Sequence, residues 1–146
     1  MSNDLYHERI IEWSKKIDRY KRLENPDCSA TVFNPLCGDR ITVELEMEND
    51  LIKAVSCSVK GCMLCKASGS ILAESAGGMK CGELKTLASD LERALKEQVD
   101  DHETFPEPYR VFFPVRRHKS RHSCVMLPLD AAIKAFSECK GCSGDK

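Results

Sequence analysis

The chain has 146 residues, a length that suits one domain with a single hydrophobic core. Its 22 Lys and Arg residues nearly balance its 23 Asp and Glu residues, so the formal charge of −1 offers no overall attraction to nucleic acid. No segment reaches the roughly 18 apolar residues of a membrane span, and the N-terminus lacks the apolar core of a signal peptide. We therefore expect a cytoplasmic protein with no nucleic-acid or membrane partner. In that compartment, nine cysteines favour metal or thiol chemistry over disulfides.

The first 60 residues predict a helix followed by a small sheet. Apolar residues recur at steps of three and four over residues 2–20, which indicates an amphipathic helix. Residues 24–36 contain two Asn-Pro pairs, so we expect a loop there. Period-two alternation over residues 41–47 and 51–59 predicts an antiparallel hairpin with one wet face and with Cys57 in the core.

The second half of the chain predicts three more helices. Residues 63–74 have helical spacing and end before a pair of glycines, and a leucine stripe marks a helix over residues 82–99. Residues 100–120 contain three prolines and are expected to be irregular. The last helix is predicted from about residue 129 to residue 139, which leaves Cys124 on the loop ahead of it.

Three cysteines and one aspartate from separate segments predict a metal site. Cys37 and Asp39 flank a glycine, so one turn can present a sulfur and an oxygen to the same ion. Cys62 lies where a strand meets a helix N-terminus, whose dipole favours a thiolate. With Cys124, these residues offer three sulfurs and one oxygen, which can close a tetrahedral shell around zinc or hold iron with an open side. Such distant ligands meet only if the whole domain folds.

The motifs around these residues resemble those of the U-type iron–sulfur cluster assembly proteins, namely the NifU N-terminal domain, IscU and SufU. They are Asn34-Pro35-Leu36-Cys37-Gly38-Asp39, then Gly61-Cys62 with Ala67-Ser68, then Cys124 with Leu127-Pro128. The resemblance covers residues 3–137 and is greatest to the SufU branch, because the stretch from the second to the third cysteine is longer than in the IscU branch. Val115-Arg116 and Arg121 also resemble a run that precedes the third cysteine in SufU.

The resemblance implies an α+β fold of the SufE/NifU type, a sandwich of a three-stranded antiparallel sheet with helices on one side. It implies one domain over residues 1–146, with a SufU-type insertion at about residues 79–110 and a short flexible tail at residues 143–146. The implied site consists of Cys37, Asp39, Cys62 and Cys124, and holds a zinc or iron ion or a labile iron–sulfur cluster.

Three functions remain open at this point. The first is a scaffold on which iron and sulfur form a labile cluster for delivery to apo acceptor or carrier proteins. The second is a zinc-bound sulfur acceptor, a sulfurtransferase that takes persulfide sulfur from a SufS-type cysteine desulfurase and stimulates that enzyme. The third is a structural zinc domain that binds a partner. The exchangeable oxygen of Asp39 argues against the third function, because structural zinc sites usually consist of Cys and His alone.

The roles of single residues follow from their chemistry. Asp39 is the weakest ligand and the natural one to leave when another group enters. Arg121 is a candidate partner for the released carboxylate. Cys37 and Cys124 are the candidate persulfide acceptors. The His of IscU-type proteins adjoins the third cysteine, whereas His122 is one position further back, so we do not expect it to bind the metal.

The remaining cysteines and the basic run have less specific interpretations. Cys65 and Cys62 form one Cys-x-x-Cys pair and Cys139 and Cys142 another, but their separation argues against a four-thiolate zinc site. Cys28, Cys57 and Cys81 are expected to be ordinary core or surface thiols. The basic run at residues 116–122 is either a solvated loop or a docking element for an acidic patch on a sulfur donor, and both interpretations stay open.

Overall fold

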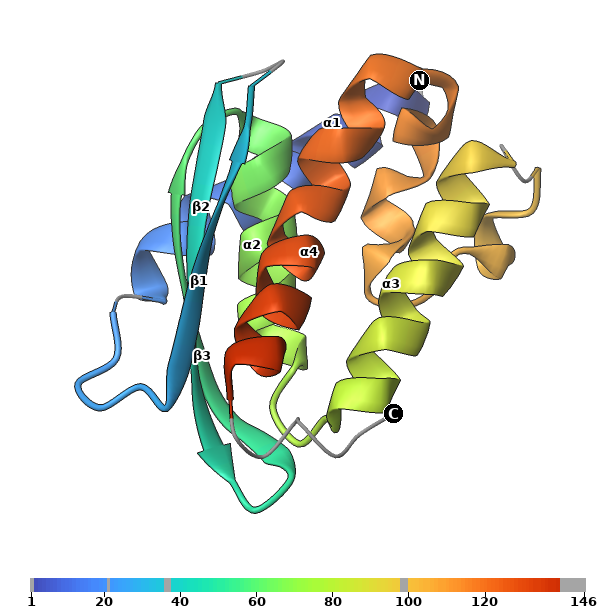
Figure 1. Ribbon diagram of the computed structural model, residues 1–146. Coiled ribbons are helices and arrows are strands. Elements are labelled where there is room, and N and C mark those ends of the chain that lie inside the picture. Colours follow the sequence, from blue (N-terminus) through green and yellow to red (C-terminus); the bar gives the residue numbers. More distant parts are fainter. Residues whose placement is uncertain (1, 21, 36–37, 98–99, 140–146) are drawn as a thin grey trace.

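An antiparallel sheet of three strands carries helices on one face in the computed structural model, which describes residues 2–20, 22–35, 38–97 and 100–139 (Figure 1). The strand order is β1 (Cys28–Asn34), β2 (Asp39–Glu48) and β3 (Leu51–Lys60). Both pairings are antiparallel, and the register places the first residue of β2 opposite the last residue of β1. The expected α+β fold is confirmed.

The helices form two layers beside the sheet. They are α1 (Ser2–Lys15), η1 (Lys16–Arg19), α2 (Met63–Ser75), α3 (Cys81–Lys96), η2 (His102–Thr104), η3 (Tyr109–Arg117), η4 (Lys119–Arg121) and α4 (His122–Glu138), where η denotes a 3₁₀ helix. Helices α2 and α4 pack directly on the sheet, and α3 and η3 lie farther out (Figure 1). Among the described residues, no helix combines the length and apolar character that crossing a bilayer requires.

The core forms where the inward face of the sheet meets α2 and α4. Ile41, Val43 and Leu45 alternate along β2 and have no exposed surface. They belong to one cluster with Leu72 of α2 and Leu129 of α4, which are equally buried. The period-two pattern of the strand and the 3.6-residue pattern of the helices thus direct their apolar side chains into the same space.

Strand β1 corrects the expectation that residues 24–36 form a loop. The strand alternates as predicted for a sheet, but its inward residues include a small Ala30 and a polar Asn34, whereas Phe33 points outward and is 56% exposed. The apolar alternation is therefore weak in the sequence. Pairing with β2 and cover from α4 stabilise the strand, and these are tertiary contacts.

Helix α4 begins seven residues before the predicted start and contains Pro128. A proline inside a helix removes one backbone hydrogen bond, so local propensity favours a start after it. Burial outweighs that cost here, because Val125, Leu127 and Leu129 around the proline are buried in the core. As a result Cys124 lies in the first turn of a helix and not on a loop.

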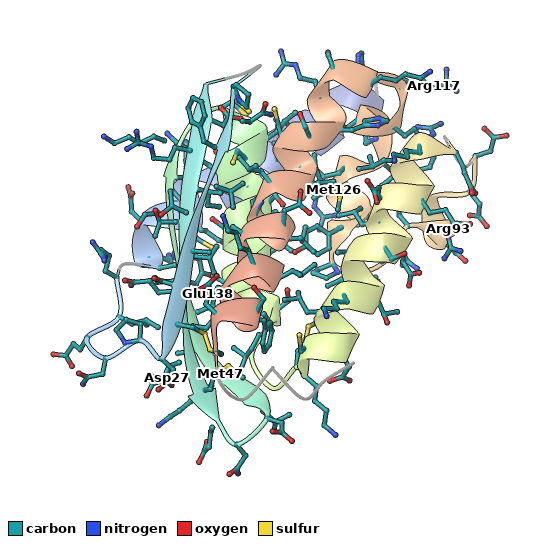
Figure 2. All side chains as sticks on the ribbon, viewed as in Figure 1. Asp27, Met47, Arg93, Arg117, Met126 and Glu138 are labelled. Atoms are coloured by element: carbon teal, nitrogen blue, oxygen red, sulfur yellow. A yellow bond between two sulfur atoms is a disulfide. The ribbon has the colours of Figure 1, made fainter. Side chains whose placement is uncertain are left out.

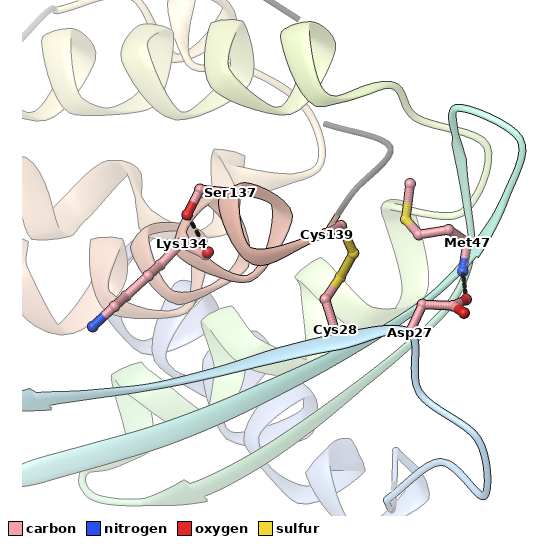
Figure 3. The surroundings of a disulfide bond; sticks show 6 residues. All are labelled: Asp27, Cys28, Met47, Lys134, Ser137 and Cys139. Atoms are coloured by element: carbon pink, nitrogen blue, oxygen red, sulfur yellow. Dashed lines mark hydrogen bonds between the residues drawn. A yellow bond between two sulfur atoms is a disulfide. The ribbon is translucent and has the colours of Figure 1, made fainter. Parts of the chain in front are cut away.

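A disulfide joins Cys28 at the start of β1 to Cys139 at the end of α4 (Figure 3). The prediction that the cysteines avoid disulfides is therefore wrong for this pair, and Cys28 is not an ordinary thiol. The bond also removes Cys139 from any zinc site built on Cys-x-x-Cys pairs, while Cys142 lies outside the described residues. Cys57 and Cys81 are free and buried, as expected for core thiols.

We predict that Cys28→Ser lowers the free energy of unfolding by several kcal/mol under non-reducing conditions. The two half-cystines are 111 residues apart, and a crosslink that closes a loop of this length restricts the unfolded chain by roughly 4–5 kcal/mol in the chain-entropy account. Urea unfolding measures the loss, and wild-type protein in reductant should match the variant. Equal midpoints for variant and wild type without reductant would contradict the disulfide.

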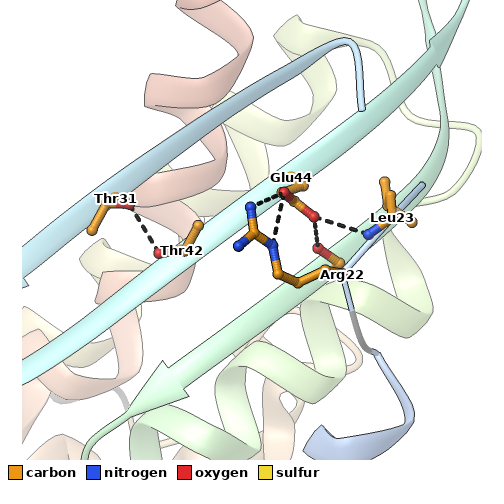
Figure 4. Close-up of polar contacts among 6 residues, drawn as sticks. Arg22, Leu23, Thr31, Thr42 and Glu44 are labelled. Carbon is orange, nitrogen blue, oxygen red and sulfur yellow. Dashed lines mark hydrogen bonds and ion pairs between the residues drawn. The ribbon is translucent and has the colours of Figure 1, made fainter. Parts of the chain in front are cut away.

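A buried carboxylate attaches the segment after η1 to the outer face of the sheet (Figure 4). Glu44 accepts hydrogen bonds from the Arg22 guanidinium at 2.9 and 3.2 Å, the Leu23 backbone N–H at 2.9 Å and the Ser56 hydroxyl at 3.0 Å. Burial acts to raise the pKa of Glu44, but the bonds from Arg22, Leu23 and Ser56 outweigh it and leave the pKa below its ordinary value. The folded protein therefore favours the ionised form.

We predict that Glu44→Gln destabilises the fold by about 1–3 kcal/mol at neutral pH, because it weakens a buried, charge-assisted network. Since the folded pKa of Glu44 is depressed, its stabilisation is complete above the unfolded pKa and is lost as pH falls through the folded pKa. The difference in unfolding free energy between variant and wild type should therefore shrink in acid. A constant difference from neutral to acidic pH would show that ionisation of Glu44 is not involved.

Candidate metal centre

Asp39, Cys62 and Cys124 meet at one end of the sheet. One ligand atom from each, a carboxylate oxygen and two sulfurs, lies within 4.8 Å of both others. The three residues come from the start of β2, the N-cap of α2 and the first turn of α4. Asp39 and Cys124 are almost fully buried, at 2% and 1% exposure.

The turn between β1 and β2 positions Asp39. The Gly38 backbone N–H donates a 2.7 Å hydrogen bond to the Asn34 carbonyl, which closes the turn. Gly38 has a φ of 75°, a left-handed conformation that glycine adopts without a steric penalty. Asn34 and Asp39 are then directly paired across the two strands.

Cys62 is bonded to Asp39 through both its backbone and its side chain. Its backbone N–H donates to Asp39 Oδ1 at 3.2 Å, and its thiol donates to Oδ2 at 3.7 Å. The preceding Gly61 allows this approach, because a Cβ atom built there would lie 2.5 Å from Asp39 Oδ1. A side chain at position 61 would therefore have to push the Asp39 carboxylate aside.

Two hydrogen bonds fix the start of α4 and with it Cys124. The Asn34 side-chain amide donates to the Ser123 hydroxyl at 3.0 Å, which ties β1 to α4 next to the site. The Ser68 hydroxyl donates to the Val125 carbonyl at 2.6 Å, which ties α2 to α4 in the core. Neither bond was anticipated from the sequence, although Ser68 belongs to the motif that follows Cys62.

The donor set fits a cation. None of the ion pairs among the described residues includes the carboxylate of Asp39, although it is 2% exposed. A buried carboxylate without a positive partner costs several kcal/mol, and two adjacent thiols add to that cost when they ionise. A zinc or iron ion would be bound by all three groups and would offset their charge.

One predicted ligand lies outside the described residues, and the other predicted site residues are not part of this cluster. Cys37 lies outside the described residues, two positions ahead of Asp39 in the chain. Arg121 is exposed and takes part in none of the ion pairs found in the described part of the chain, so its pairing with a released Asp39 stays a prediction. Cys65 is fully buried and is not one of the three clustered ligands.

His122 also lies outside the cluster. Its Nε2 is 3.0 Å from the Arg116 carbonyl, so this ring nitrogen is engaged with backbone. Arg116 is 8% exposed and stacks on the Phe113 ring at 3.7 Å while donating to the Phe113 carbonyl. Arg116 therefore contributes packing at the entrance to α4, which a basic run in the sequence does not predict.

Cys57 differs chemically from the clustered cysteines. It faces the core from β3 and is 2% exposed. Burial raises the pKa of Cys57 to about 12, so its thiolate is scarce at neutral pH. It therefore suits neither metal binding nor sulfur transfer.

We predict that Gly61→Ala lowers metal affinity, because the added methyl group clashes with Asp39 and pushes the adjoining Cys62 thiol, as well as the carboxylate, out of position. Metal content after dialysis against a competing chelator measures the effect. Gly82→Ala is the matched control, since a Cβ atom at Gly82 of α3 meets nothing within 4 Å. Equal metal retention by the two variants would refute the proposed packing of Gly61 against a metal ligand.

Comparison with known proteins places this chain in a family. A model of the NifU-like N-terminal domain matches residues 5–141. The iron–sulfur cluster assembly scaffold protein IscU of Thermotoga maritima is 23% identical over 136 residues, which cover 91% of this chain and 95% of that protein. The zinc-dependent sulfurtransferase SufU of Bacillus subtilis is 27% identical over 75 residues, which cover 51% of each chain.

Solved structures agree with these matches. The crystal structure of a nitrogen-fixing NifU-like protein (N-terminal) from Brucella abortus superposes with a TM-score of 0.83 and 31% identity, and covers 100% of this chain and 99% of that one. A SufU scaffold protein from Fervidobacterium islandicum has the same fold, with a TM-score of 0.78 at 24% identity over 88% of this chain and 93% of that one. Because the family model spans nearly the whole chain, this protein belongs to the family of NifU-like N-terminal domains.

Proposed function

We propose that this protein is an iron–sulfur cluster assembly scaffold that builds a labile cluster at Asp39, Cys62 and Cys124, with Cys37 as a further ligand. The observation that carries the proposal is the buried Asp39 carboxylate beside two thiols within 4.8 Å. The family match and the IscU relatives confirm the scaffold function expected from the sequence. The residues assigned to the cluster are part of the proposal.

The cluster is cargo, so its ligands must both hold it and let it go. Thiolates bind iron with strong covalency and hold the metal, whereas a carboxylate oxygen exchanges more readily. We assign Asp39 the exchange role because it is the oxygen ligand of the set. Its two hydrogen bonds to Cys62 give the carboxylate a defined position when it is not bound to metal.

Sulfur would arrive as a persulfide on a cysteine desulfurase. A thiolate of this chain, Cys37 or Cys124, attacks the outer sulfur, the desulfurase S–S bond breaks, and the desulfurase thiolate leaves. The step conserves electrons. Conversion of the transferred sulfur into sulfide requires two electrons from a separate donor. The partners in this scheme are a SufS-type desulfurase and the apo acceptor or carrier proteins.

A zinc-bound sulfurtransferase of the SufU type is the second candidate. Helix α3 lies within the stretch at residues 79–110 where SufU-type proteins are expected to carry their insertion, and the Bacillus subtilis sulfurtransferase matches half of the chain. In this function the same ligands would hold a resident zinc ion, and a thiol released from zinc would accept the sulfur. A structural zinc domain is the third candidate and is the least suited to an exchangeable carboxylate.

Domain organisation and location complete the proposal. We assign residues 1–146 to one NifU-like domain with the SufU-type insertion at about residues 79–110. The expected flexible tail at residues 143–146 lies outside the described residues. We propose a cytoplasmic location. The disulfide between Cys28 and Cys139 is a feature that counts against this location, because reducing compartments keep most thiols free.

Purification without oxygen tests the function directly. The scaffold function predicts bound iron and sulfide, visible charge-transfer absorption, and transfer of the cluster to an apo ferredoxin. Cys62→Ser and Cys124→Ser should lose most of the metal, whereas Cys57→Ser should keep it. Zinc alone, no visible absorption, and zinc-dependent stimulation of a cysteine desulfurase would favour the sulfurtransferase. Full metal retention by Cys124→Ser would refute the assigned site.

We predict that Asp39→Ala traps the cluster or metal and does not empty the site. The thiolates contribute most of the affinity, and water can occupy the position of the lost oxygen. The rate of cluster or sulfur transfer should fall about tenfold or more, while metal content stays close to that of wild type. Transfer at the wild-type rate would show that exchange does not proceed through the carboxylate.

A further inference from the structure

The surface around the metal centre has a charge distribution unlike that of the rest of the chain. The centre lies among three segments, residues 33–40, 60–66 and 116–124. These hold seven of the 22 Lys and Arg residues and one of the 23 Asp and Glu residues, the ligand Asp39 itself. The remainder of the chain therefore has a net negative charge, and the three segments that carry the ligands have a net positive charge.

One part of this surface is a row across the outer face of the sheet. Phe33 of β1 is paired with Arg40 of β2, and Arg40 is paired with Lys60 of β3. Directly paired residues point to the same face of a sheet, so the three side chains are neighbours. All three are exposed, and the row lies one residue from Asp39 and two residues from Cys62.

The other part lies on the helical side of the centre. Arg117, Lys119 and Arg121 are exposed and lead into α4, whose first turn contains Cys124. Figure 2 shows Arg117 beyond the beginning of α4 and Glu138 at the opposite end of that helix. We call these three residues, together with Phe33, Arg40 and Lys60, the site rim.

Within the described part of the chain, the cations of the rim form no ion pair. The five ion pairs among the described residues use basic side chains at positions 22, 53, 93, 96 and 110, none of which belongs to the rim. Two of the three exposed large apolar side chains in the described part of the chain, Phe33 at 56% and Met63 at 38%, also lie at this end. Arg, Met and aromatic residues are enriched at protein interfaces.

We propose that the site rim docks an acidic, partly apolar surface of the protein that donates sulfur, and holds that protein over the thiols of the metal centre. This partner rests on the proposed function. Unpaired cations steer an acidic partner during encounter, and Phe33 and Met63 supply apolar contact after docking. A protein fits better than a nucleic acid, because the basic run lacks interleaved aromatic residues on which bases would stack.

The test is binding of the metal-loaded chain to a purified SufS-type cysteine desulfurase. The variant Arg40→Glu/Lys60→Glu removes the positive row, and Phe33→Ala removes the apolar anchor. Lys85→Glu/Lys134→Glu is the matched control, because it makes the same change in net charge at exposed positions on α3 and α4 away from the centre. Circular dichroism and metal content report whether each variant folds and loads, and Arg40→Gln/Lys60→Gln provides a milder change.

We expect the Glu variant to bind the desulfurase about tenfold or more weakly, mainly through a slower association rate, and to lose most of the salt dependence of wild type. Phe33→Ala should mainly raise the dissociation rate. The control should bind within about twofold of wild type. Metal content should not change in any variant.

Other outcomes overturn the proposal. If wild type accepts sulfur and the Glu variant binds equally well with the same salt dependence, the rim is not the docking surface and the proposed function stands. If the rim variants lose affinity for a single-stranded oligonucleotide but not for the desulfurase, the rim binds nucleic acid. If wild type neither binds the desulfurase nor takes its sulfur, the proposed partner and this docking surface both fail.

Discussion

The burial of Asp39 is the constraint on which the rest of the site depends. A carboxylate that is 2% exposed has lost almost all of its hydration, and among the described residues it accepts one hydrogen bond from the Cys62 backbone and a weak one from the Cys62 thiol. These hydrogen bonds are too weak to offset the desolvation cost of an isolated charge in the interior. The arrangement is stable when a cation completes it, so metal binding and local folding are linked.

The fold holds the ligands by joining β1 to α4 at both ends. Next to the site, the Asn34 side chain bonds Ser123, one residue ahead of Cys124. At the other end, Cys28 and Cys139 are joined covalently. β1 and α4 also pack against each other between these points. A movement of α4 that withdraws Cys124 would have to break contacts along both elements, which limits how far this thiol can leave the metal.

The sequence predicts those parts of the structure that rest on local periodicity or on close motifs. The β2–β3 hairpin, α1, α2 and α3 follow from such patterns, and three of the four expected ligands lie in one cluster. Strand β1 and the first turns of α4 depend on tertiary contacts that outweigh local propensity. The disulfide between Cys28 and Cys139 joins residues 111 positions apart, and spacing alone gives no reason to pair them.

The charges of the proposed centre and of the surface near it are opposite in sign. With Cys37 as the proposed fourth ligand, three thiolates and one carboxylate around a divalent ion would leave a net charge of about −2 in a poorly hydrated site. Exposed cations at Arg40, Lys60 and Arg121 lie nearby in the chain and give the surface there the opposite sign. When an incoming anionic sulfur replaces the Asp39 carboxylate, one negative charge enters as another leaves. The net charge at the metal does not change, so the exchange requires the carboxylate to move but does not require the site to accommodate additional charge.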